Sequence, residues 1–192
     1  MNTFSFAPGI PSGYAYPSLY FNAASDTLLV TVHRTSTEDL PPRDIILWRA
    51  LSNQIYTSIF VESENHSQEQ LVVSVTKPVA FFSTHIWRKS KSRDTPEGPE
   101  KESWGGDWHS LSKLDLIDKS IIKICEKGSV KLPTPYSDFW ISDLIQVTPE
   151  NDVILVAGLS QPDQGSVTYV VGHLATGTTE FQIISELHSP FA

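Results

Sequence analysis

Six histidines and one cysteine are the side chains of this 192-residue sequence best suited to metal binding or acid–base chemistry. His33 and His85 lie near the ends of two stretches with the same pattern, so in a repeated fold they could lie at a similar height. With partners from a second copy they could bind a metal ion, because imidazoles are common metal ligands. The alternative is that each is a hydrogen-bonded histidine beside a loop. Cys125 lies in an apolar stretch without a neighbouring base, which favours packing over nucleophilic chemistry.

The motifs of several large enzyme classes are missing from the sequence. There is no Gly-x-Ser-x-Gly turn of a hydrolase, no Walker A loop, no Gly-x-Gly-x-x-Gly, no Cys-x-x-Cys and no His-Glu-x-x-His. We therefore expect no cofactor, assign no catalytic residue and favour a protein that is not an enzyme.

Aromatic residues form a second group of candidates. Trp87, Trp104 and Trp108 flank a long polar stretch, with two glycines between the last two, and His109 follows directly. Aromatic side chains beside a glycine hinge are suited to closing over a small molecule or to anchoring a protein partner. The alternative is that the rings fold this stretch back onto its own sheet. Trp87, Trp104, Trp108 and His109 are the candidate ligand- or partner-binding residues.

The rest of the chain must position these residues, and its pattern is that of β-strands. Apolar stretches rich in β-branched residues alternate with short turns, and the same order occurs three times. Second strands are predicted to begin at positions 27, 79 and 153, and third strands at 44, 109 and 166. This spacing fits repeats of about 40 to 50 residues with insertions. One insertion, the charged stretch 88–102, is expected to be a long mobile loop.

The predicted fold is therefore all-β, a β-propeller segment of three four-stranded antiparallel blades in a single propeller half. Blade one covers about residues 14–62, blade two about 69–126 and blade three about 139–187.

Two stretches, Leu111–Ile124 and Val170–Phe181, resemble the third and fourth strands of a known blade pattern, with apolar residues on both sides of a short turn. Thr148-Pro149-Glu150-Asn151 is similar to the Ser-Pro-Asp-Gly turn of the same blades. On these motifs, the chain resembles the TolB-like and prolyl-oligopeptidase-type β-propellers. The resemblance implies a propeller fold and no particular activity.

Three blades do not close a ring, because propellers typically use four to eight. Blades one and three would each expose an apolar outer face, which a soluble monomer rarely tolerates. Two copies could pair into a six-bladed ring, a different protein could supply a second propeller half, or the sequence could be half of a longer chain. We favour the homodimer.

The charge is distributed unevenly. The chain has 14 basic and 22 acidic residues, a net charge of −8, which disfavours a nucleic-acid partner. All 14 basic residues and 15 of the acidic ones lie at or before Lys131, giving −1, and the remaining seven acidic residues give −7 after it. This acidic third is either a solvated surface or a docking face for a basic partner.

The sequence also predicts the compartment. No apolar stretch reaches the roughly 18 residues of a membrane helix, and the N-terminus resembles no secretory signal. A single cysteine excludes an internal disulfide and suits a reducing environment. We therefore expect a cytoplasmic protein without a membrane partner.

Two hypotheses about function follow. The first is a non-catalytic binding or assembly module, a half propeller that pairs with another copy or partner and could bind a small molecule. The second is an enzyme whose active site forms in the channel of the completed ring, with metal-assisted or acid–base chemistry on a small molecule.

Overall fold

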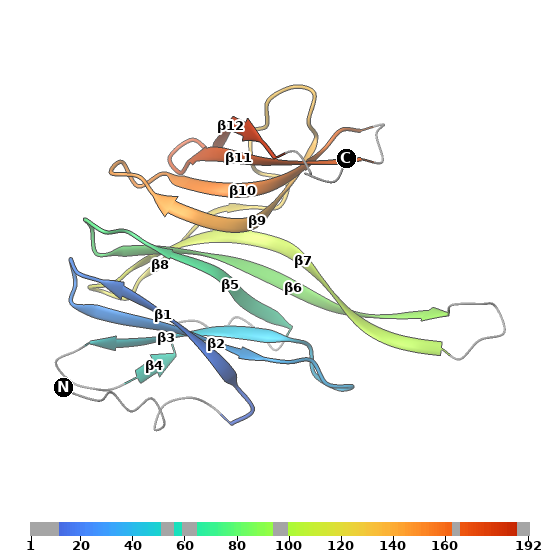
Figure 1. The fold of residues 1–192 in the computed structure, drawn as a ribbon, viewed down its shortest axis with the longest axis horizontal. Coiled ribbons are helices and arrows are strands. Elements are labelled where there is room, and N and C mark those ends of the chain that lie inside the picture. Colours follow the sequence, from blue (N-terminus) through green and yellow to red (C-terminus); the bar gives the residue numbers. More distant parts are fainter. Residues whose placement is uncertain (1–11, 51–55, 59–64, 94–99, 163–165, 188–192) are drawn as a thin grey trace. The chain divides into compact units, whose positions relative to one another are not determined.

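The structure is a computed structural model, which describes residues 12–50, 56–58, 65–93, 100–162 and 166–187. Within these ranges the regular elements are twelve β-strands and no helix (Figure 1). The strands form three four-stranded sheets, in each of which consecutive strands are neighbours. The predicted all-β fold of three antiparallel four-stranded sheets is thus confirmed. In the described ranges, no helical segment has the length and hydropathy that crossing a membrane requires.

The first sheet is formed by the N-terminal strands, in the order β1-β2-β3-β4. Its second and third strands pair in antiparallel register from Thr27 opposite Ala50 to Arg34 opposite Arg43. The turn predicted at 52–54 and most of the fourth strand predicted at 55–61 lie outside the described residues. The strands are β1 (Ala15–Asn22), β2 (Thr27–Arg34), β3 (Arg43–Ala50) and β4 (Tyr56–Ser58).

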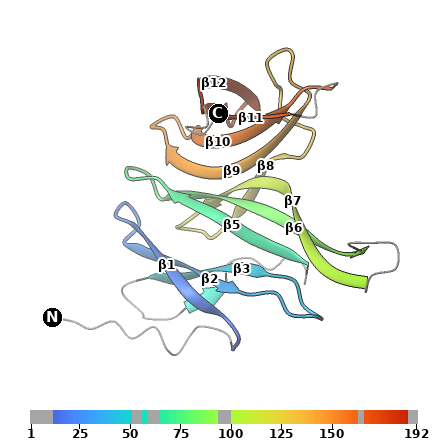
Figure 2. The same ribbon diagram turned by 45° about the vertical axis from the view of Figure 1, so that its right-hand side comes forward.

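The second sheet has the order β5-β6-β7-β8 and contains the two longest strands of the described chain. The predicted loop 88–102 is wrong, because β6 continues to Arg93 and β7 starts at Glu100. These strands form one long hairpin, whose tip lies outside the described residues (Figures 1 and 2). Lys89 and Glu102 form an ion pair of 2.5 Å across it. The charged residues that led to the prediction of a loop therefore form ion pairs between two strands. The strands are β5 (His66–Val73), β6 (Val79–Arg93), β7 (Glu100–Asp115) and β8 (Ile121–Glu126).

The third sheet has the order β12-β11-β10-β9. The turn between its first two strands forms as predicted: the backbone N–H of Thr148 donates to Asp152 O, and Asn151 takes a positive φ of 76°. The strands are β9 (Asp138–Val147), β10 (Val153–Ser160), β11 (Val167–Ala175) and β12 (Glu180–Glu186).

The chain divides into two compact units, and the boundary between them does not follow the division into sheets. The first unit contains residues 1–21, 26–69 and 85–107, and the second contains 22–25, 70–84 and 108–192. The second sheet therefore contributes to both units, with the outer part of the β6–β7 hairpin in the first.

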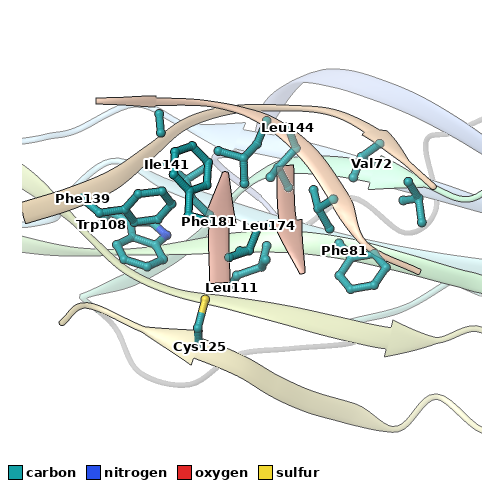
Figure 3. Packing of buried hydrophobic residues seen from close by; sticks show 14 of the residues in the cluster. Val72, Phe81, Trp108, Leu111, Cys125, Phe139, Ile141, Leu144, Leu174 and Phe181 are labelled. Atoms are coloured by element: carbon teal, nitrogen blue, oxygen red, sulfur yellow. The ribbon is translucent and has the colours of Figure 1, made fainter. Parts of the chain in front are cut away.

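The main core of the second unit lies between the inner parts of β6 and β7 and the third sheet. Trp108, Phe139 and Phe181 form a row of edge-to-face aromatic contacts with centroids 5.3 and 5.1 Å apart (Figure 3). Cys125 is buried in this core, and burial raises the pKa of its thiol to about 12. A thiol with this pKa is not a nucleophile at neutral pH, so it packs as a small apolar group.

The first unit has a smaller core on one face of the first sheet. Val30, Val32, Ile45 and Leu47 are buried there, and Tyr14 packs against them. The alternate residues of the same strands, among them His33, point to the opposite face, because successive strand residues alternate. Both faces of β2 and β3 therefore bury apolar side chains, whereas Leu19 and Phe21 of β1 are 52% and 53% exposed.

Candidate functional site

The first unit brings together two imidazole–carboxylate pairs from four strands. His33 of β2 and Asp44 of β3 are directly opposite each other in the β2–β3 register, and His33 Nδ1 forms a short contact with Asp44 Oδ1. His85 Nδ1 of β6 lies 3.0 Å from Glu69 Oε2 of β5. In this article these four residues are called the histidine–carboxylate cluster.

The second pair continues into a chain of hydrogen bonds. Trp87 Nε1 donates to Ser67 Oγ over 2.8 Å, and Ser67 Oγ donates to Glu69 Oε1 over 2.9 Å. These three residues and His85 lie at alternate positions of β5 and β6, which places their side chains on one face. The carboxylate of Glu69 thus accepts a hydrogen bond from the Ser67 hydroxyl at one oxygen and lies against the His85 imidazole at the other.

The pKa values of the two carboxyls of the cluster, those of Asp44 and Glu69, are shifted in opposite directions. Burial raises the pKa of Asp44, and the hydrogen bond and charge of His33 only partly oppose this effect. Burial also acts to raise the pKa of Glu69, but the close contact and charge of His85, together with the Ser67 hydroxyl and the charge of His33, outweigh it, so that this pKa is lowered. Glu69 and His85 also act electrostatically on Asp44. A pair of carboxyls with opposite shifts is a common arrangement in acid–base sites.

A third imidazole–carboxylate pair has a structural role. His173 Nε2 lies 3.1 Å from Asp152 Oδ2, and Asp152 Oδ1 accepts a hydrogen bond from the Thr176 backbone N–H. This pair joins two neighbouring turns of the third sheet. It is part of a turn and not of a site.

From the sequence, His33 and His85 are the candidates for binding a metal ion. Each of these imidazoles has its own carboxylate partner, and the described residues contain no group of three or more potential metal ligands.

A cavity of about 520 Å³ also lies in the first unit, beside the β6–β7 hairpin. Trp104 is in its wall, and its Nε1 donates to Thr37 O over 3.1 Å. Lys89 Nζ lies 6.0 Å from the centre of the Trp104 ring. The lining is mixed polar and aromatic: Ser36, Thr37, Glu38, Lys89, Glu102, Ser103 and Trp104.

The structure does not gather the four candidate binding residues in one place. Trp87 lies over Gly106, where an added Cβ would be 2.8 Å from the ring, so this ring folds the hairpin together. Trp108 is only 2% exposed and belongs to the core of the second unit, out of reach of a ligand at the surface. His109 is in the second unit, on the strand face opposite to Trp108. Trp104 is the one of the four that lines a described cavity.

The sequence alone did not suggest Asp44 or Glu69. Asp44 could have been found, because counting along the β2–β3 hairpin places it opposite His33. Glu69 was harder to find, because the next residue of β5, Gln70, has a positive φ of 36° and interrupts the regular strand. An irregularity of this kind is not visible in the apolar pattern.

The third sheet presents a different kind of surface. Val153, Leu155, Ala157 and Leu159 of β10 face inward and are fully buried. The alternate residues of the same sheet form its outer face, defined here by Trp140, Ile154, Val156, Val167, Tyr169 and Val171.

Aromatic side chains lie at the middle of this outer face. Gly158 is opposite both Trp140 and Tyr169 in the register, and the Trp140 ring covers it, so that an added Cβ would be 2.2 Å from the ring. The two rings meet edge to face with centroids 6.3 Å apart. Tyr169 is 45% exposed and Val167 is 44% exposed. The outer face is therefore apolar at its middle, with Val167 and Tyr169 open and its other four residues half-buried.

The charges at the outer face are all acidic on the β9 side. Asp143 is opposite Val156 and Asp138 is opposite Ser160 in the register, so both carboxylates lie on this face, and both are exposed. No Lys or Arg occurs in the sequence of the third sheet. Lys131, just before the sheet, lies 3.8 Å from the carboxylate of Glu180 on β12.

Comparison with known proteins assigns no family. No family model matches the chain, and no curated protein matches it. One solved structure that it resembles is a Trypanosoma rangeli sialidase in complex with 2-keto-3-deoxy-D-glycero-D-galacto-2,3-difluoro-nononic acid. The TM-score is 0.43 at 7% sequence identity, and the match covers 91% of this chain and 30% of the sialidase chain.

These findings correct one prediction from the sequence. The resemblance to TolB-like and prolyl-oligopeptidase-type propellers is wrong, because no family model matches the chain and a solved structure that it resembles is a sialidase. The repeated motifs describe a four-stranded antiparallel sheet in general and not one family.

Proposed function

We propose that this chain is a non-catalytic assembly module that binds the surface of another protein chain through the outer face of its third sheet. The observation that carries the proposal is the open apolar face around Trp140 and Tyr169. Exposed aromatic and aliphatic side chains that are contiguous on one surface mark an interaction site more often than a solvated surface. The partner would supply the missing blades of a six-bladed ring.

The third sheet has a feature that supports this choice. Val167 and Tyr169 remain almost half exposed, and the Tyr169 ring meets the Trp140 ring edge to face. The first sheet also has open apolar side chains, because Leu19 and Phe21 of β1 are 52% and 53% exposed. The proposal concerns the third sheet, where aromatic rings in contact lie beside the exposed aliphatic residue.

Photo-crosslinking in cells that produce the chain tests this proposal. A benzophenone amino acid at Val167 should give one discrete adduct, which mass spectrometry identifies as a second copy or as another protein. The same group at Ile122, a 56% exposed position on β8, is the matched control and should give none. The variant Tyr169→Glu should remove the adduct. The absence of a discrete adduct at Val167, or equal yields at both positions, would contradict the proposal.

A second candidate function is acid–base catalysis at the histidine–carboxylate cluster. The observation that favours it is the opposite direction of the pKa shifts of Asp44 and Glu69 within one group of four titratable side chains. The cavity beside Trp104, also in the first unit, could take a small polar molecule. In this case His85 would be held by Glu69 while it accepts a proton.

A measurement of catalytic turnover distinguishes the two proposed functions. Hydrolysis of a panel of chromogenic esters and glycosides should be absent if the chain is an assembly module. Turnover that varies with pH and is lost in both His33→Asn and His85→Asn, but kept in Tyr169→Glu, would establish the enzyme.

We further propose a cytoplasmic location, on the ground that Cys125 is an unpaired thiol.

A further inference from the structure

We infer that the partner of the outer face is a different protein whose apolar surface has a basic rim, and not the same face of a second copy. This inference rests on the proposed function. It concerns the chemistry of the partner, which the apolar side chains alone do not determine.

The first step of the argument is the charge on the face itself. Asp138 and Asp143 project from β9 on the same side as Val156 and Trp140. Their Oδ1 atoms accept hydrogen bonds of 2.9 and 2.8 Å from the backbone N–H groups of Phe139 and Leu144. These are backbone contacts, so the negative charge of each carboxylate is not neutralised by them.

The second step is the lack of a compensating charge. The sheet has no Lys or Arg in its sequence. Lys131 lies beside Glu180 at the opposite edge, and His173 lies beside Asp152. Lys77, from the turn between β5 and β6, donates to the Pro149 carbonyl in the β9–β10 turn. Among the described residues, no ion pair joins a lysine or arginine to Asp138 or Asp143, so both carboxylates are open to a charged partner.

The third step compares the partners that could cover the face. A twofold axis would place the outer face of one copy against the same acidic face of another. Like charges across an interface oppose association, whereas complementary charges favour it and fix the orientation. A basic rim around an apolar centre matches both properties of the outer face.

Two synthetic peptides test the inference on the full chain. One alternates valine with lysine and the other alternates valine with glutamate, so that they differ only in the sign of the charge. Each is titrated into the isotope-labelled chain, and amide resonances of Val167, Tyr169 and Val171 are followed by NMR. We expect the lysine peptide to shift these resonances and the glutamate peptide to leave them unchanged.

Two variants make the readout specific. Asp138→Asn with Asp143→Asn should weaken binding of the lysine peptide about three- to tenfold, the usual effect of two partly exposed charges. Tyr169→Glu should remove the shifts by disrupting the apolar centre, and Ile122→Glu on β8 should leave them intact.

The outcomes separate this inference from the proposed function. If both peptides bind the outer face equally, the face is an assembly surface but the basic partner is excluded. If neither peptide shifts the outer-face resonances, both the inference and the proposed function are overturned. Binding of the lysine peptide that is unchanged in the Asp138→Asn and Asp143→Asn variant would also contradict the inference.

Discussion

The carboxyl of Glu69 makes the clearest case for an electrostatic contribution to folding. Its pKa is lowered in the folded chain, because His85, Ser67 and His33 together outweigh the effect of burial. A lowered pKa means that the stabilisation is present at neutral pH and is lost as the pH falls through the folded-state pKa. Glu69→Gln should therefore lower the free energy of unfolding at pH 7 by about 1 to 2 kcal/mol, with a smaller difference near pH 4. Urea unfolding at both pH values measures this.

Asp44 is the matched comparison, with the opposite sign. Burial raises its pKa in the folded chain, so its contribution to stability is present at low pH and is lost as the pH rises. Relative to the unchanged chain, Asp44→Asn should therefore gain stability as the pH increases from about 4 to about 7. A pH dependence of the same sign for Glu69→Gln and Asp44→Asn would show that the cluster is wrongly described.

Asn22 is a buried amide whose hydrogen bonds join two turns. Its Nδ2 donates to Ser74 O and Lys77 O, each over 2.8 Å, and its Oδ1 accepts from the Ser25 N–H. Asn22→Asp keeps the shape but removes both donors, so we expect a loss of about 2 kcal/mol or more in the free energy of unfolding. Denaturation with urea checks this, and a loss below about 0.5 kcal/mol would contradict the assignment.

The third sheet depends on a glycine where two strands approach closely. An added Cβ at Gly172 would lie 2.0 Å from Phe181 Cζ, and Phe181 is buried and cannot move away freely. Gly172→Ala should therefore destabilise the chain by about 1 to 3 kcal/mol through overpacking. Thermal unfolding compares it with Gly177→Ala, where nothing lies within 4 Å of the added atom. Equal melting temperatures for the two variants would rule out this packing.

The strands could be predicted better than the site. Period-two patterns and turn residues were sufficient for the three four-stranded sheets, because each strand is short and has a buried face. The stretch 88–102 was misinterpreted because its pattern is charged, and ion pairs such as Lys89–Glu102 across the hairpin are long-range information. The pairing of His85 with Glu69 was missed for the same reason, since it depends on how β5 and β6 align and not on the local sequence.

The larger arrangement of charge and apolar surface was only partly visible in the sequence. The acidic C-terminal third could be counted directly. That two of its carboxylates, Asp138 and Asp143, share a face with Trp140 follows only from the register of β9 and β10. The burial of both faces of β2 and β3 could not be foreseen, because both faces of these strands are apolar and the pattern does not tell which is exposed.

The central claim is that the outer face of the third sheet is an apolar assembly surface with acidic charges around it. Light scattering on a size-exclusion column, in about 0.05 M and about 1 M NaCl, tests this most directly. In high salt the Debye length, the distance over which exposed charges repel each other, falls to about 3 Å. We predict the 21.4 kDa monomer in low salt and a rise in mass in high salt. The rise should vanish in Tyr169→Glu and persist in Ile122→Glu. A mass of twice 21.4 kDa in low salt that falls as salt is added would contradict the account, as would a mass that never changes.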